Sequence, residues 1–355
     1  MQLSRLRASN APLRISRFML KSSQPVIREI YSVRRLHMQR KTRTTALQEL
    51  APIWLADVRM RVKESTYTRY YRNVYRYLLP HLGETPVYKL NTLQVSGYAD
   101  FLLSQGGIRG SGLAPKTVSD ILSTLNTVLQ YGQLCGYPCA PARGIRLPGS
   151  YRQMVTLPPD SRALLEKLIL SRNDTTSIGI MLSLFAGLRI GELCGLRWED
   201  IDLKNKTLTV NRTVERIADL NASYNRTKLI ISEPKTANSY RQIPLPHFLT
   251  ERLGMLTPVE GAYLLSGSDS PIEPCTFYKR YRRFLTVNGL PAYRFHALRH
   301  TFATRCVEVG FDTKALSEIM GHANVATTMA IYVHPPMAQK RRYMEKLAPN
   351  FAHKK

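Results

Sequence analysis

The sequence predicts a mainly α-helical chain with one small antiparallel β-sheet, an α+β fold divided between two domains. Three observations support this prediction. The chain has 355 residues, more than one domain usually contains. Apolar residues recur at helical spacing through most of it, and β-rich segments appear only between residues 206 and 246. A stretch rich in Pro, Gly and Arg, "PCAPARGIRLPGS", separates two helical regions and is typical of a linker, which we place at residues 141–155.

Composition and charge limit the kind of partner. Lys and Arg total 51 against 25 acidic residues, a formal net charge of +26. Because so many positive charges repel one another, they favour a polyanionic partner, with nucleic acid first and an anionic membrane surface second. With 44% apolar and 21% charged residues, the chain is too apolar for general disorder.

The cysteines and apolar runs exclude several other classes. Five cysteines form an odd set with neither a CxxC motif nor Cys/His ligand spacing, so no disulfide framework or zinc site is indicated. The longest apolar run, near Ile178, is interrupted by Gly and Ser and is too short to span a bilayer. We expect a reducing compartment and no membrane partner.

Residues 1–44 form a basic extension. They contain eleven Lys or Arg residues and one acidic residue, Glu29, without a clear hydrophobic period. This composition favours a basic arm that contacts DNA phosphates. An organellar transit peptide, also rich in Arg and poor in acids, is the alternative.

Residues 45–140 are predicted to form a bundle of about four helices. A first helix near Leu47 is followed by "ESTYTRYYRNVYRYLLPHLG", which Ser65 is placed to cap. The segments "NTLQVSGYADFLLSQG" and "LAPKTVSDILSTLNTVLQYG" supply two more. Most of the tyrosines in the second of these helices are interpreted as core residues. The candidate DNA contacts at the entries to the second and last helices are Lys63, Thr66, Arg69, Arg72 and Lys116.

Residues 156–340 are predicted to form a second domain of mixed structure. "TLPPDSRALLEKLIL" and "TTSIGIMLSLFAGLRIGELCGLRWEDID" have helical spacing. "KTLTVNRTV", "TKLIISEP" and "YRQIPLP" are β-rich, and a polar turn, "EPKTANS", separates the last two. From His296 onward the pattern is helical again. Residues 341–355 form a tail, and a helix is expected from about Met337 to Leu347.

Four short motifs in the second domain contain polar residues that suit a reaction on a phosphate. They are "AGLRIGEL", "EPKTANSYRQIPL", "HALRHT" and "GH", the last followed ten residues later by a tyrosine. Each motif alone has an ordinary structural explanation, such as a salt bridge, a solvated turn or a helix cap. Their order and spacing together resemble the tyrosine recombinase (phage integrase) family. The matching residues are Arg189, Glu192, Lys235, His296, Arg299, His322 and Tyr332.

The resemblance covers about residues 45 to 340 and carries expectations for the whole chain. It implies a helical core-binding (SAM-like) domain at 45–140, followed by a catalytic domain at 156–340. It implies DNA cleavage and rejoining through a 3′-phosphotyrosyl intermediate by a homotetramer on two double-stranded recombination sites. Accessory DNA-bending or excision factors are possible further partners. The expected location is the cytoplasm of a bacterial cell, at the nucleoid.

The chemistry of the side chains agrees with these roles. Arg189 and Arg299 offer permanently charged donors for the equatorial oxygens of a phosphorane. Tyr332 is the candidate nucleophile, and Lys235 is the candidate acid for the 5′-hydroxyl leaving group. The remaining candidates are His296 as proton acceptor or phosphate ligand, His322 as donor to a nonbridging oxygen, and Glu192 and His300 as supporting residues. No motif in the sequence asks for a metal ion or a nucleotide cofactor.

Three functions agree with the sequence. Integration or excision of a mobile genetic element, from a phage or a conjugative transposon, is favoured because of the basic extension. Resolution of chromosome or plasmid dimers would use the same catalytic residues. The alternative of another class is a DNA-binding regulator that kept the fold without catalysis, against which the complete set of reactive residues argues.

Overall fold

A computed structural model describes residues 44–149, 155–221, 226–233, 240–322 and 324–332, together with Met337, Arg341 and Met344. The predicted basic arm (residues 1–43 of it), Lys235 and most of the predicted tail helix lie outside these residues. The chain divides into two compact units, Met1–Ser150 and Tyr151–Lys355. No helix in the described part is long and apolar enough to cross a membrane.

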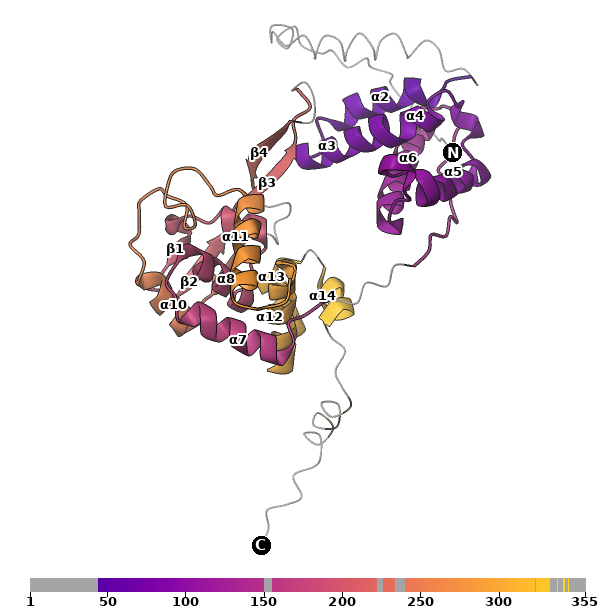
Figure 1. Cartoon of the computed structure of the whole chain (residues 1–355). Helices are drawn as coiled ribbons and strands as arrows, with labels where there is room; N and C mark the ends of the chain where they lie inside the picture. Colours follow the sequence, from indigo (N-terminus) through magenta and orange to yellow (C-terminus); the bar gives the residue numbers. More distant parts are fainter. Residues whose placement is uncertain are drawn as a thin grey trace, which may run out of the picture. The chain divides into compact units, whose positions relative to one another are not determined.

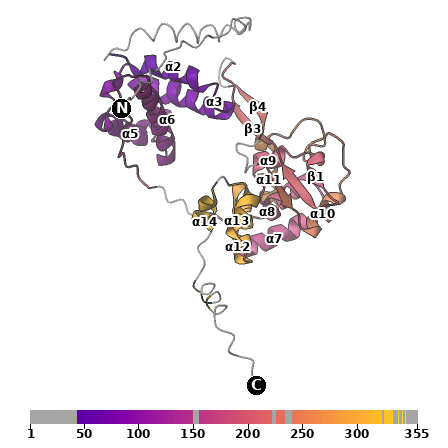
Figure 2. The same cartoon turned by 180° about the vertical axis from the view of Figure 1, so that it is seen from behind.

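The described part of the first unit is a helical bundle, as the sequence predicts (Figures 1 and 2). Its core consists of apolar side chains from all the long helices, among them Leu50, Trp54, Leu102 and Leu125, which are almost completely buried. The helices are α2 (Leu47–Val58), α3 (Glu64–Arg72), α4 (Leu79–Leu82), α5 (Thr92–Gln105) and α6 (Pro115–Leu134).

Helix α3 continues into α4 through a π-helical turn, Asn73–Leu78. The Asn73 side chain is buried in this turn, and its amide donates to the Thr124 hydroxyl of α6 at 2.9 Å. The hydrogen bond explains how a polar residue is accommodated between two packed helices. The predicted cap of α3 is wrong: the helix begins at Glu64 after an extended Lys63, so Ser65 lies inside its first turn.

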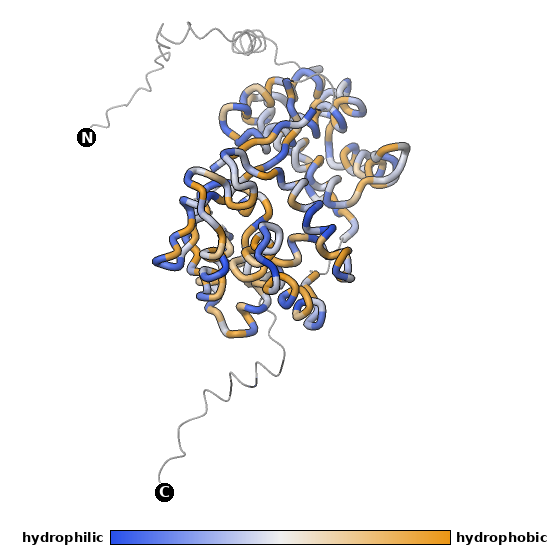
Figure 3. The backbone as a smooth tube through the Cα atoms, turned by 60° about the vertical axis from the view of Figure 1, so that its left-hand side comes forward, coloured by the Kyte–Doolittle hydropathy of each residue, from blue (hydrophilic) through white to orange (hydrophobic). Residues whose placement is uncertain are grey.

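The second unit packs helices around α8 (Thr175–Phe185), whose residues 177–184 are all buried. This helix is buried on every side because other helices surround it, and most of its buried side chains are apolar. The other helices are α7 (Pro159–Leu170), α9 (Ile190–Cys194), α10 (His247–Gly254), α11 (Pro274–Val287), α12 (His296–Glu308), α13 (Thr313–Met320) and α14 (Val325–Tyr332). Figure 3 shows hydrophobic and hydrophilic stretches alternating along the backbone of both units, as amphipathic elements require.

The β-rich segments form two antiparallel sheets instead of the single sheet predicted. Strands β1 (Ile201–Asp202), β2 (Thr207–Val210) and β5 (Arg241–Pro244) pair in the order β1-β2-β5. Strands β3 (Thr213–Ala218) and β4 (Thr227–Ser232) form the second sheet. Short strands of this kind position side chains at the edge of the helical core.

The last two β-rich segments, which the polar turn "EPKTANS" separates, do not pair with each other. Strand β4 pairs with β3, while β5 pairs with β2. The registers are Val210↔Arg241 between β2 and β5, and Thr213↔Ser232 between β3 and β4. Only residues 211 and 212 separate β2 from β3, whereas residues 233–240 separate β4 from β5. Lys235 lies between β4 and β5 in the sequence, outside the residues that the structure describes.

Candidate active site

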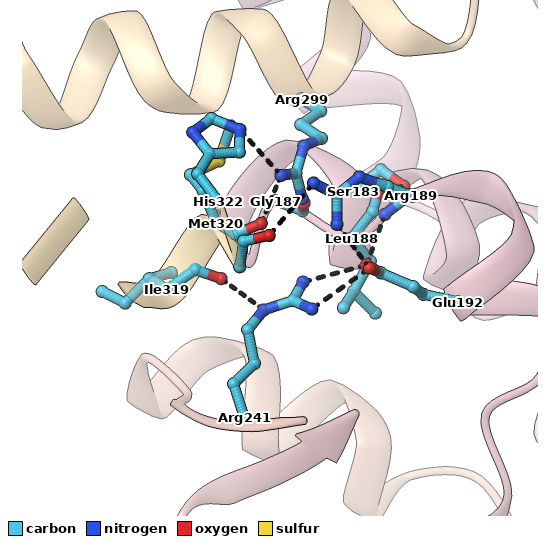
Figure 4. A network of polar contacts seen from close by, with 11 residues as sticks. Ser183, Gly187, Leu188, Arg189, Glu192, Arg241, Arg299, Ile319, Met320 and His322 are labelled. Atoms are coloured by element: carbon cyan, nitrogen blue, oxygen red, sulfur yellow. Dashed lines mark hydrogen bonds and ion pairs between the residues drawn. The ribbon is translucent and has the colours of Figure 1, made fainter. Parts of the chain in front are cut away.

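Three arginines converge on the C-terminal end of α13. The carbonyls of residues 319–321 lie beyond the hydrogen bonds of the last helical turn, where a helix end carries partial negative charge. Each carbonyl accepts from a different guanidinium group (Figure 4). The pairs are Arg241 Nε with Ile319 at 2.6 Å, Arg299 Nη2 with Met320, and Arg189 Nη2 with Gly321 at 3.4 Å. The helix end thus gathers three cations from separate elements.

Gly321 is required at this position for two reasons. It has a left-handed backbone conformation with φ 61°, which terminates α13. A Cβ atom here would lie 2.9 Å from Nη1 of Arg241. The glycine before His322 therefore allows the helix to end against a guanidinium group.

Glu192 lies at the centre of the arginines and is buried. Its carboxylate accepts from Nη1 of Arg189 at 2.7 Å, and from Nη1 and Nη2 of Arg241 at 3.1 and 2.9 Å. Burial alone would raise the pKa of Glu192, but hydrogen bonding and the charge of Arg241, followed by the charges of Arg189 and Arg299, lower it to about 2. One carboxylate against three guanidinium groups leaves the site with two excess positive charges.

Arg299 is 1% exposed and ties α12 to two other parts of the site. Besides Met320, it donates to the carbonyl of Gly187, in the turn between α8 and α9. Its Nη2 atom also lies 3.3 Å from Nε2 of His322. These contacts hold the guanidinium in one orientation before any ligand binds.

The histidines of the site are uncharged at neutral pH. The pKa of His296 falls to about 4 because of burial, then the charges of His300, Arg299 and Arg189. The pKa of His322 also falls to about 4, through burial and then the charges of Arg299, Arg189 and Arg241. Burial and Arg299 lower the pKa of His300, whose ring lies edge-on to His296 with centroids 4.4 Å apart. A phosphate would favour the protonated forms of these rings.

Helix α14 is attached to this site through Thr328. The Thr328 side chain is buried, and its hydroxyl lies 2.8 Å from Nδ1 of His322. Tyr332 is the last residue of α14, one helical turn beyond Thr328 along the backbone. The side chain of Tyr332 lies outside the part of the chain that the structure describes.

The structure thus gathers most of the predicted residues of the second domain. Arg189, Glu192, Arg299 and His322 form one network of contacts, and the His296–His300 pair lies on the helix that carries Arg299. Arg241 is part of the same network, and it was not singled out from the sequence. The available signal was its position two residues before Ile243, on the buried side of a short strand with alternating burial.

The candidate DNA contacts in the first unit differ in exposure. Arg69 and Arg72 are exposed on α3, whereas Lys63 and Thr66, at the start of that helix, are half-buried. Lys116 is exposed on α6, but its ammonium pairs with Asp120 at 2.9 Å. Of this set, the α3 arginines are therefore the exposed cations that pair with no carboxylate among the described residues, and they remain the strongest candidates for phosphate contacts.

The gathered side chains match the demands of an oxyanion site. Two fixed guanidinium groups, Arg189 and Arg299, lie beside an imidazole, and the local charge is positive. Such an arrangement favours a phosphate group over a neutral ligand and does so without reorganisation. Among the residues that the structure describes, no group of three or more His, Cys, Asp or Glu side chains is arranged to hold a metal ion.

Comparison with known proteins agrees with this chemistry. The model of the phage integrase family matches residues 160–339, and that of the phage integrase N-terminal SAM-like domain matches residues 46–103. A protein named tyrosine recombinase XerC-like, from Caldanaerobacter subterraneus subsp. tengcongensis, is 30% identical over 328 residues, which cover 85% of this chain and 82% of that relative. The ICEBs1 integrase of Bacillus subtilis is 21% identical, with 87% and 84% covered.

Solved structures show the same fold. The Tn1549 transposon integrase in complex with transposon right end DNA has a TM-score of 0.68 at 23% identity, covering 86% of this chain and 100% of that one. A lambda integrase tetramer bound to a Holliday junction has a TM-score of 0.57 at 16% identity, covering 82% and 80%. At these identities the likeness concerns the fold alone.

Proposed function

This chain belongs to the phage integrase family and is a site-specific DNA recombinase of the tyrosine type, and we propose that it integrates or excises a mobile genetic element. The observation that carries the catalytic part is the pair of fixed guanidinium groups, Arg189 and Arg299, beside His322. Mobile-element integrases among the relatives, including the ICEBs1 integrase, support the biological part.

In the proposed reaction the phenolic oxygen of Tyr332 attacks the scissile phosphorus. A bond forms between that oxygen and phosphorus, and the bond from phosphorus to the 5′-oxygen breaks. The Tyr332 proton passes to His296, whose neutral ring can accept it. Lys235 gives a proton to the departing 5′-oxygen. Reversal of these steps with another 5′-hydroxyl rejoins the strand and restores the enzyme.

The charged side chains act on the nonbridging oxygens. Arg189 and Arg299 stabilise the charge that these oxygens gain in the pentacoordinate transition state. His322 donates to one of them once it is protonated. Glu192 and His300 support the arginine and histidine groups that they contact. No step consumes an external energy source because the phosphotyrosine retains the bond energy.

The proposed assembly is a homotetramer on two recombination sites. Strand exchange between two duplexes needs four cleavages, one from each of four protomers. We propose that α3, through Lys63, Thr66, Arg69 and Arg72, and α6, through Lys116, contact the DNA backbone. Accessory DNA-bending or excision factors would control direction, and the protein would act in the bacterial cytoplasm, at the nucleoid.

A covalent-complex assay tests the proposal. The substrate is a duplex that contains the joined ends of the element adjoining the gene for this chain, with a nick that lets the cleaved 5′-hydroxyl fragment diffuse away. We expect a DNA-protein adduct that survives SDS and that leaves a 3′-end blocked by a peptide after proteolysis. A chain that binds this duplex and forms no adduct would refute the catalytic proposal.

Resolution of chromosome or plasmid dimers is a second candidate. It is supported by the 30% identical relative, which is named tyrosine recombinase XerC-like. The two functions share one cleavage reaction, so adduct formation does not separate them. Recombination of the two element ends, which yields a circular element and rejoined flanking DNA, supports integration or excision of a mobile element. Conversion of a plasmid dimer to monomers at the plasmid's own recombination site, without recombination of the element ends, supports dimer resolution.

A further inference from the structure

Arg241 occupies a position that no phosphate-binding role explains. It lies on β5 and is 7% exposed, with its guanidinium directed into the site (Figure 4). Two of its nitrogens donate to the two oxygens of Glu192, at 3.1 and 2.9 Å, and its Nε donates to the carbonyl of Ile319. The fork geometry of arginine suits this bidentate contact, which a lysine cannot reproduce.

The contacts of Glu192 divide between two arginines with different surroundings. Arg241 binds both carboxylate oxygens, and its side chain is 5% exposed. Arg189 binds only Oε1 through its side chain, which is 37% exposed. Because a charge-assisted contact is stronger when it is desolvated, the carboxylate is compensated mainly by Arg241. Arg189, the more exposed cation, faces less competition from Glu192.

We propose that Arg241 is a positioning residue of the recombination reaction. It neutralises and fixes Glu192, so that the positive charges of Arg189 and Arg299 remain available to the DNA phosphate. This inference rests on the proposed function, because the phosphate contact is part of that function. Without Arg241, a buried carboxylate of full charge would remain between the two phosphate-binding arginines. It would hold Arg189, which already contacts Oε1 at 2.7 Å, more strongly, and it would offset the charge of one of these two arginines.

Arg241 also couples two parts of the site. The bond to Ile319 ties β5 to the end of α13, directly before His322, while the bonds to Glu192 tie it to α9. Gly321 leaves just enough space for this guanidinium, because its missing Cβ would meet Nη1, Cδ and Cζ of Arg241. A change at Arg241 therefore alters position as well as charge, and the test has to separate the two.

The test asks whether a second substitution raises or lowers the rate of adduct formation. Arg241→Met should slow adduct formation on the nicked substrate by about tenfold or more, the size typical for loss of a supporting partner at a reaction site. Adding Glu192→Gln should then raise the rate, because it removes the uncompensated charge and keeps acceptor and donor groups in place. In the wild-type background, Glu192→Gln should lower the rate. This reversal of sign is the expected coupling between residues in contact.

The pH profile supplies a readout that a purely structural role would not move. Arg189, Arg241, Arg299 and His296 are the charged or titratable groups that act on Glu192 electrostatically. With Arg241 removed, the pKa of Glu192 should rise. Arg241→Met should cleave more slowly than Arg241→Met/Glu192→Gln at neutral pH. This difference in rate should shrink as the pH falls, since protonation of Glu192 removes the same negative charge that Glu192→Gln removes. Arg241→Lys, which keeps the charge, should retain more activity than Arg241→Met.

Arg212 offers a matched control. It forms an ion pair with the buried Asp200 at 2.7 Å in the same unit, and its guanidinium donates to Gly195, Glu199 and Asp200. Arg212→Met should lower the thermal midpoint, and adding Asp200→Asn should produce no pH-dependent recovery of cleavage. If Arg241→Met does not fold, Arg241→Gln takes its place in the same comparison, because it removes the charge and keeps hydrogen-bonding groups.

Three results would overturn the inference. One is an unchanged cleavage rate in folded Arg241→Met. Another is a further loss of rate when Glu192→Gln is added at neutral pH. The third is a rate deficit that does not vary with pH. A wild-type chain that forms no adduct would refute the proposed function instead; an NMR titration of the Glu192 carboxyl carbon, with and without Arg241→Met, would still test the electrostatic role of Arg241.

Discussion

The Nη2 atom of Arg299 lies 3.3 Å from Nε2 of His322, and this contact assigns the protons of the imidazole. A guanidinium group can only donate, so Nε2 accepts, and neutral His322 carries its proton on Nδ1. That proton is donated to the Thr328 hydroxyl at 2.8 Å. His322 can therefore donate to a phosphate through Nε2 only after it takes up a second proton.

The stability of the DNA-free protein is expected to fall in mild acid through His296 and His322. The folded-state pKa of each is about 4, below the ordinary value of 6.5, so the unfolded chain binds protons first. Their contribution is complete above pH 6.5 and is lost as the pH falls from 6.5 towards 4. His296→Gln and His322→Gln should each reduce the drop in thermal midpoint across this window. Equal drops in all three proteins would contradict the assignment.

Binding of the recombination site should take up protons near pH 5.5. A phosphate beside His322 favours the charged imidazole, so its pKa rises in the complex and a proton enters from solution. Calorimetric titrations in buffers of different ionisation enthalpy measure this uptake directly. We expect His322→Gln to bind fewer protons than wild type at the same pH. His247→Gln is a suitable control, because that ring is exposed on α10 and pairs with Glu251.

Local sequence was enough to predict the residues that lie close to one another along the chain. The capping contact between Arg189 and Glu192 spans three residues, and His296 and Arg299 share one helix. Their relation to His322 was inferred from a family resemblance. The structure adds the physical link, because the end of α13 offers carbonyls to arginines from three other elements.

Long-range strand pairing is what the sequence did not reveal. A polar turn between two β-rich segments suggests that they pair with each other, yet β4 and β5 each pair with a strand earlier in the chain. The same pairing directs Arg241 inward. The spacing of two residues places Arg241 on the same face of β5 as Ile243, and the register with β2 makes this the buried face.

DNA affinity should fall steeply with salt, and α3 should account for part of the slope. Each phosphate contact contributes about −0.9 to the slope of log K against log salt. The double substitution Arg69→Gln/Arg72→Gln should therefore make the slope shallower by about two, a change measured by fluorescence anisotropy. Lys116→Gln should have a smaller effect because Asp120 already pairs with that ammonium. Affinity that scarcely changes between low and physiological salt would contradict phosphate clamping.

Tyr332 is expected to be the sole nucleophile. Tyr332→Phe should bind the recombination site with wild-type affinity and form no SDS-resistant adduct, because only the phenolic oxygen is removed. Tyr343→Phe is the matched control and should form the adduct normally. Adduct formation by Tyr332→Phe would transfer the role to another tyrosine, and Tyr343 would be tested first.

Lys235 is expected to be the general acid, and a sulfur-substituted substrate separates this role from phosphate binding. General acid catalysis typically contributes about a hundred- to ten-thousand-fold, so Lys235→Ala should bind DNA and cleave slowly. A thiolate leaves without a proton. Replacing the bridging 5′-oxygen by sulfur should therefore restore cleavage by Lys235→Ala, whereas Arg189→Ala and Arg299→Ala should stay slow, because their charge acts on the nonbridging oxygens. If Lys235→Ala is not rescued, another residue supplies the proton, and His296 is the next to test.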